Sequence, residues 1–271
     1  MKKSNVLYLA FMLMVGLVAN AQTEFKKSLK GISRIEIESN TSIAIKKGTT
    51  DQLILKEGCY NCADSEETES TWEDEDVSID EKAKGLKAIY AGGEDNTGLG
   101  MYIEINGEVL RINDLKSFYK RKGLTLTIPA SVAIKLQTGN LGNVIIEDLT
   151  NELEINTVVG YIKLTNVTGP ITAHSSTGNI DAIFSSVDQS APISITSSTG
   201  MIDVSLPSNT KASVELGSTM GSVFTNFDLI KPREDGLKAV GGQKSITGNI
   251  NKGGVKIALK ASVGNIYLRK K

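Results

Sequence analysis

The chain has 271 residues with 30 basic and 31 acidic side chains, which gives a formal net charge of −1 at neutral pH. This balance provides no overall basic charge of the kind that attracts nucleic acid, and we expect no nucleic-acid partner. Aromatic residues make up only 5% of the chain, whereas glycines number 26. Such a composition favours many short strands joined by tight turns.

Residues 1–21 predict a secretory signal peptide. Lys2 and Lys3 form a basic start, residues 6–18 are an apolar stretch too short to span a bilayer, and "ANA" at 19–21 is a small-x-small cleavage site. Cleavage there leaves 250 of the 271 residues. Because no cysteine lies near the cut, we expect an exported chain without a lipid anchor or a transmembrane segment, in the periplasm or at the cell surface.

Residues 22–123 form an N-terminal β region in this interpretation. Short alternating stretches such as "SRIEIES" (33–39) and "MYIEINGEVLRI" (101–112) predict strands. The stretch 63–81 interrupts them, with ten acidic residues and no basic one between Asp64 and Glu81. We expect a solvated acidic loop. Its "DEDVSID" segment lacks the glycine and the glutamate that an EF-hand requires at its sixth and twelfth positions, so calcium binding there stays open.

The two cysteines, Cys59 and Cys62, form a C-x-x-C pair just before this loop. A zinc site needs further ligands, and a thioredoxin-like pair needs a βαβ setting that the sequence does not show. In an exported protein, a local disulfide between Cys59 and Cys62 is the favoured interpretation. We therefore expect no cofactor and, apart from the open question of calcium at the acidic loop, no metal.

Residues 124–271 carry an internal repeat, which we expect to be continuous with the N-terminal β region. Its consensus is aliphatic residues seven and five positions before a glycine, a small residue three before it, and a β-branched aliphatic residue two after it. Alternation on both sides of a glycine predicts a strand, a corner and a second strand. Most copies are 18–22 residues apart, and the predicted corners are Gly142, Gly160, Gly178, Gly200, Gly221, Gly248 and Gly264.

A period near 20 residues is typical of a stacked architecture. We expect an all-β fold, a single-stranded β-solenoid whose rungs of 18–22 residues stack equivalent side chains in columns, with the aliphatic columns inside. A β-sandwich is the alternative, although it would not need the same residue type at the same offset in every copy.

The chain resembles the bacterial putative-adhesin, β-strand-repeat family of exported envelope proteins. The resemblance rests on "LTIPASVAIKL" (126–136), on the repeated "TGNI"-like corners, and above all on "TGNINKGGVKIALKASVGNIYLRK" (247–270). It implies an all-β, solenoid-like domain outside the cytoplasm, and it transfers no catalytic residue to this chain.

Two features are candidate sites within the repeat. His174, the only histidine, falls at an outward position in the column of Asn156 and Thr196, where no carboxylate would orient it for catalysis. Three residues after the corner glycines, Lys163, Asp181 and Asp203 should form an outward surface column. Paired carboxylates of this kind could bind a cation or serve acid–base chemistry on a polysaccharide, or they could be a solvated charge ladder.

The sequence therefore predicts an exported, non-enzymatic, adhesin-like binding or scaffold protein of the cell envelope, with no catalytic residues. Its expected partner is an envelope glycan or a surface protein. One alternative is a purely structural envelope component, and the other is a polysaccharide-active β-helix enzyme that uses Lys163, Asp181 and Asp203. Residues 237–271 hold eight basic and no acidic side chains, which would attract anionic polymers or protect the end of the solenoid from stacking.

Overall fold

A computed structural model describes residues 24–59, 86, 89–90, 92–116, 123–140, 142–230 and 245–271. Within these ranges the chain forms twenty strands and no helix, and so no helix there is suited to crossing a membrane. The strands are β1 (Glu24–Ser28), β2 (Arg34–Ser39), β3 (Ile43–Lys47), β4 (Gln52–Glu57), β5 (Met101–Asn106), β6 (Val109–Asp114), β7 (Leu124–Ile128), β8 (Ala133–Thr138), β9 (Val144–Glu147), β10 (Leu153–Val159), β11 (Ile162–Val167), β12 (Ile171–Thr177), β13 (Ile180–Phe184), β14 (Ile193–Thr199), β15 (Ile202–Leu206), β16 (Ala212–Ser218), β17 (Val223–Thr225), β18 (Ile246–Ile250), β19 (Val255–Val263) and β20 (Ile266–Lys270).

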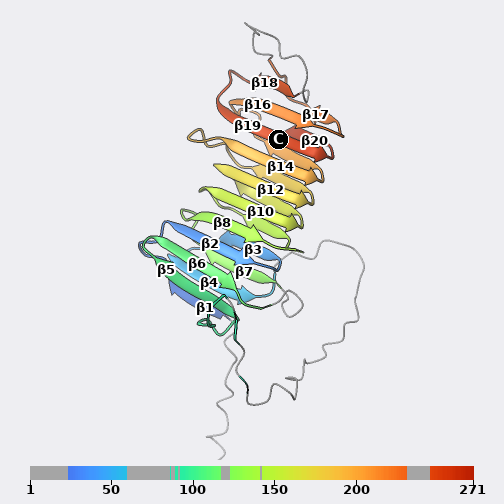
Figure 1. Ribbon diagram of the computed structural model, residues 1–271. Helices are drawn as coiled ribbons and strands as arrows, with labels where there is room; N and C mark the ends of the chain where they lie inside the picture. Colours follow the sequence, from blue (N-terminus) through green and yellow to red (C-terminus); the bar gives the residue numbers. More distant parts are fainter. Residues whose placement is uncertain are drawn as a thin grey trace, which may run out of the picture.

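The strands form two ten-stranded sheets (Figure 1). Sheet A has the order β1-β4-β7-β3-β9-β11-β13-β15-β20-β17, and sheet B has the order β18-β16-β19-β14-β12-β10-β8-β2-β6-β5. A repeat copy contributes one strand to each sheet, and the corner glycine lies between them. Successive copies stack in parallel, so the predicted solenoid is confirmed, with two strands in each rung. The same two sheets run through both the N-terminal region and the repeat region.

The core lies between the two sheets, because alternate side chains of each strand point inward. In β12 the inward residues are Ile171, Ala173 and Ser175, and all three are buried. They pair in register with Leu153, Ile155 and Thr157 of β10 on one side and with Ile193, Ile195 and Ser197 of β14 on the other. The columns of like residues are therefore continuous, which is what a repeat of this kind requires.

The order of the rungs in space differs from their order in the chain at both ends. The β2–β3 rung lies between β6–β7 and β8–β9, and the C-terminal β19–β20 rung lies between β14–β15 and β16–β17. The corner glycines therefore stack in the order Gly142, Gly160, Gly178, Gly200, Gly264 and Gly221. The prediction for Gly248 was wrong: it lies inside β18, which pairs with β16 in antiparallel orientation and ends sheet B.

Candidate binding faces

The corner is the most constrained part of each rung. Gly160, Gly178, Gly200 and Gly264 have φ values between 140° and 150°, which side-chain-bearing residues rarely adopt. A Cβ added at Gly178 would lie 2.0 Å from the carbonyl oxygen of Gly160, and Gly160, Gly200 and Gly264 meet the corner beside them in the same way. The glycine is therefore required both by its backbone conformation and by the approach of the neighbouring corner.

Side chains bond each corner to its neighbour. The buried hydroxyls of Thr157, Ser175 and Ser197 donate to the carbonyl oxygens of Gly142, Gly160 and Gly178 at 3.1–3.2 Å. The Asn179 side-chain oxygen accepts the backbone N–H of Met201 at 2.9 Å, as Asn143 and Asn265 do for their own neighbours. These bonds fix the spacing of the rungs, and the outward side chains therefore project from a rigid frame.

The predicted column Lys163, Asp181 and Asp203 lies on the outer face of sheet A, where the three residues pair directly on β11, β13 and β15. The column continues with Tyr267 of β20 and Phe224 of β17. The sequence prediction missed Tyr267 because it assumed that the rungs stack in the order in which they follow one another in the chain, which places β17 and not β20 beside β15. The signal was present, since Tyr267 stands three residues after Gly264, the offset that defines the column.

Asp203 is held by a cation that the sequence analysis did not single out. Nε of Arg269 donates to Oδ1 of Asp203 at 2.8 Å, and Nη2 donates to Oδ2 at 2.8 Å. The hydrogen bonds and the negative charge of Asp203 raise the pKa of Arg269 above its ordinary value. A carboxylate engaged in this two-point ion pair is not positioned to exchange a proton with a substrate, which argues against Asp203 as an acid–base group.

Arg269 also contacts an aromatic ring on the same face, and that ring stacks on a second one. We call the four residues together the aromatic surface: Asp203, Arg269, Tyr267 and Phe224. The Arg269 guanidinium carbon lies 5.2 Å from the centre of the Tyr267 ring, and that ring stacks on Phe224 with the same separation and an angle of 11°. Phe224 remains 50% exposed on the outermost strand of sheet A. A shallow hollow of about 390 Å³ lies between Phe224, Asn226 and Arg269. Exposed aromatic and arginine side chains of this kind are typical of contact surfaces.

His174 lies on the outer face of sheet B, half-buried, between Asn156 and Thr196 as predicted. Its Nδ1 is 2.9 Å from the Thr196 hydroxyl, and its Nε2 is 3.4 Å from the hydroxyl of Ser176. No carboxylate is among these partners. A serine hydroxyl at this longer distance and a threonine in the orienting position do not reproduce a catalytic triad.

Glu215 of β16 gives sheet B its strongest electrostatic feature. Its carboxylate lies 2.8 Å from Lys256 and 2.7 Å from Lys260, both on β19. Hydrogen bonds from Lys256 and Lys260 lower the pKa of Glu215 from 4.5 to about 2. These ion pairs link the β16–β17 rung to the β19–β20 rung beside it.

Because the folded state lowers this pKa, the stabilisation by Glu215 is complete above about pH 4.5 and is lost as the pH falls towards 2. We expect Glu215→Gln to lower the free energy of unfolding at neutral pH and to reduce its dependence on pH between about 4.5 and 2. Urea unfolding at a series of pH values measures both effects. An unchanged pH dependence in the variant would contradict the assignment.

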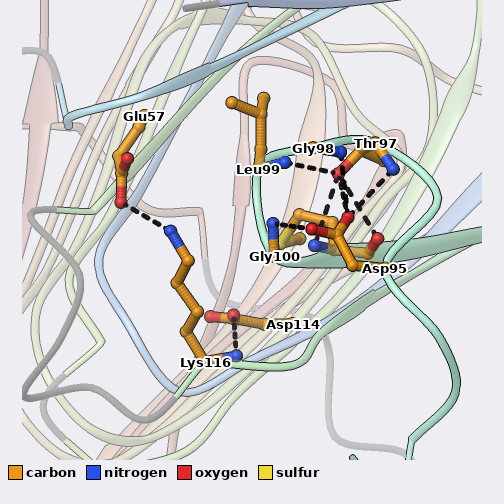
Figure 2. A network of polar contacts seen from close by, with 9 residues as sticks. Glu57, Asp95, Thr97, Gly98, Leu99, Gly100, Asp114 and Lys116 are labelled. Atoms are coloured by element: carbon orange, nitrogen blue, oxygen red, sulfur yellow. Dashed lines mark hydrogen bonds and ion pairs between the residues drawn. The ribbon is translucent and has the colours of Figure 1, made fainter. Parts of the chain in front are cut away.

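The loop before β5 shows how a polar network can be purely structural (Figure 2). Asp95 accepts the backbone N–H groups of Thr97, Gly98 and Gly100 at 2.9–3.0 Å. Burial acts to raise the pKa of Asp95, but the hydrogen bonds from Thr97 and Gly100 outweigh it, and the pKa falls below its ordinary value. Since these donors come from its own loop, the carboxylate serves to fold the loop.

The same figure shows a link between the two sheets at this end of the stack. Lys116, which follows β6 in sheet B, forms an ion pair of 3.3 Å with Glu57 of β4 in sheet A. The backbone N–H of Lys116 donates to Asp114 at 3.1 Å. The ion pair therefore joins the two sheets one strand inside this end of the stack.

Several predictions fall outside the described residues: the signal peptide 1–21, the acidic loop 63–81, and Cys62. Cys59 is described and lies beside Gly123, whose missing side chain leaves room for it. The Cys59–Cys62 disulfide stays a prediction. Among the described residues, no three His, Cys, Asp or Glu side chains are grouped so that they could hold a metal ion.

These features define a class: an all-β repeat protein that stacks two-strand rungs and presents the outer faces of two sheets. The family model described as Toastrack DUF4097 matches residues 134–269, half of the chain. The chain belongs to this family, which confirms the resemblance to a family of β-strand-repeat proteins.

Two solved structures are similar to this chain. One is a putative cell adhesion protein from Clostridium sporogenes, with 13% identity and a TM-score of 0.43, covering 92% of this chain and 99% of that one. The other is a putative adhesin from Bacteroides fragilis, with 14% identity and a TM-score of 0.42, covering 90% of this chain and 95% of that one. No curated protein matches the chain.

Proposed function

We propose that this chain is an exported, non-enzymatic, adhesin-like protein of the cell envelope, and that the aromatic surface binds an envelope glycan or a surface protein. One observation carries the proposal: Phe224 is half exposed at the end of an ordered stack formed with Tyr267 and Arg269. Leaving an aromatic ring in water is unfavourable, and a partner that covers the ring recovers this free energy.

The rigidity of the frame supports the same proposal. Arg269 is fixed by Asp203, and Tyr267 accepts a hydrogen bond from the Asn265 side chain at 3.1 Å. A surface that is ordered before binding loses little conformational entropy when a partner arrives. The ion pair of Asp203 makes the polysaccharide-active enzyme the weaker alternative.

The test is the binding of the mature chain to envelope fragments of the producing bacterium, before and after the fragments are treated with protease. We expect Phe224→Ala with Tyr267→Ala to weaken binding about tenfold or more, because aromatic anchors of this kind contribute about 2 kcal/mol or more. Lys163→Ala, at the far end of the same column, is the matched control. Loss of binding after protease treatment would identify a protein partner, and retention would identify a glycan.

Binding that is equal in the double variant and in the unmodified chain would contradict the role of the aromatic surface. If the unmodified chain does not bind the fragments at all, the purely structural alternative is favoured. Protease treatment of intact cells, followed by detection of this chain, separates a surface location from a periplasmic one.

A further inference from the structure

The outer face of sheet B holds a second surface, far along the stack from the aromatic surface. A groove of about 370 Å³ lies over β6, β2, β8 and β10. Four of the residues that line it occupy the same outward position on these four neighbouring strands. They are three carboxamides and one carboxylate, and we call them the amide row: Asn113, Glu38, Gln137 and Asn156. At about 4.8 Å between strands, the row is about 14 Å long.

The amide row differs from the column beside it in that its side chains have no polar partners among the described protein residues. Two residues earlier on the same four strands stand Arg111, Glu36, Lys135 and Glu154, which also pair in register. Arg111 bonds Glu36 at 3.0 Å, and Lys135 bonds Glu154 at 3.0 Å, so every charge in that column has a partner. Within the described part of the chain, the side chains of the amide row make no hydrogen bond or ion pair with other protein groups.

The shape of the groove depends on a small residue. A Cβ at Gly139 would lie within 2.2 Å of the side-chain oxygen of Asn40, so the absence of a side chain at Gly139 leaves room for that carboxamide. Asn40 and Gly139 both line the groove. Asp114 also lines it and is held by the Ser39 hydroxyl at 2.9 Å. Four carboxamides and two carboxylates therefore face one hollow.

This chemistry selects a class of ligand. A carboxamide offers a donor and an acceptor side by side, and a sugar hydroxyl offers the same pair. Among the described residues that line the groove there is no lysine or arginine, whereas Glu38 and Asp114 are present, so these residues would repel an anionic ligand. We propose that the groove on sheet B binds a neutral, hydroxyl-rich glycan segment, which lies along the stack and hydrogen-bonds to the amide row. This site is independent of the aromatic surface.

The test uses the mature chain and ligand-detected NMR with neutral hexose and N-acetylhexosamine oligosaccharides, from trisaccharides to hexasaccharides. Uronic-acid oligosaccharides of the same lengths are the anionic comparison. We expect binding of at least one neutral oligosaccharide, and a loss of about tenfold or more in affinity for Gln137→Ala with Asn156→Ala. Thr172→Ala with Ser194→Ala is the matched control, because these residues also face outward on sheet B but do not line the groove.

Gly139→Ala supplies a second variant that removes no carboxamide but should displace that of Asn40, and we expect it to weaken the same binding. Urea unfolding of each variant separates loss of binding from loss of the fold. No binding of any neutral oligosaccharide, equal binding by the alanine double variant, or a preference for the uronic acids would each overturn the proposal. Phe224→Ala should leave this binding unchanged, so the two binding surfaces can fail separately.

Discussion

Gly178→Ala should lower the free energy of unfolding by about 4 kcal/mol, one of the two largest effects that we expect in this chain. Two costs add at this position. The backbone has a φ of 150°, and a residue with a side chain pays about 1–3 kcal/mol to be held in such a region. The new Cβ would also lie 2.0 Å from the Gly160 carbonyl oxygen, which forces two hydrogen-bonded corners apart at a further cost of about 1–3 kcal/mol.

Alanine variants at two other glycines separate the cost of the backbone conformation from the cost of the close contact. Gly31 has a φ of 80° but no atom within 4 Å of its added Cβ, so Gly31→Ala should cost only the backbone term, about 1–2 kcal/mol. Gly217 lies in β16 without a positive φ, and its nearest neighbours are at 3.8 Å, so Gly217→Ala should be nearly neutral. Urea unfolding of the three variants measures the series. If Gly178→Ala costs no more than Gly31→Ala, the close contact between corners does not contribute.

The corner itself could be predicted from the sequence because its causes are local. Alternating residues on both sides of a glycine define two strands and a bend, and the small residue three before the glycine marks the hydroxyl that bonds the neighbouring corner. Ala261 occupies that position in β19, and it has no hydroxyl to donate to the Gly200 carbonyl. The consensus therefore located the position of the bonding side chain, but it specified only a small residue there, and the hydrogen bond itself became visible only in the structure.

The order of the rungs could not be predicted, because similar rungs pair equally well with one another. Val214 and Leu216 of β16 carry the same inward pattern as Ile257 and Leu259 of β19, so the pattern does not decide which strand neighbours β14. The aromatic surface was missed for this reason, since it forms only when β20 lies between β15 and β17. The amide row was missed because its residue types differ from strand to strand, and only the register brings them together.

The insertion of the last rung leads to the second large effect. A chain that ends at Gly254 lacks β19 and β20, which stand inside the stack between β14–β15 and β16–β17. It loses five fully buried side chains, those of Ile257, Leu259, Ala261, Ile266 and Leu268. At about 1.5–3 kcal/mol for each of the four large ones, their burial contributes about 6–12 kcal/mol.

Because each rung of a solenoid is stabilised mainly by its neighbours, the loss should not stop at the deleted residues. We expect β16, β17 and β18 of the shortened chain to become sensitive to protease, while the strands from β1 to β15 stay folded with lower stability. Limited proteolysis with mass mapping tests this expectation. Removal of residues 24–28 is the control, since β1 is an edge strand with mostly exposed side chains, and its loss should leave the other rungs protected. If β16, β17 and β18 stay protected in the shortened chain, β16–β17 has paired with β14–β15 directly, and the inserted β19–β20 rung is dispensable for folding the C-terminal end.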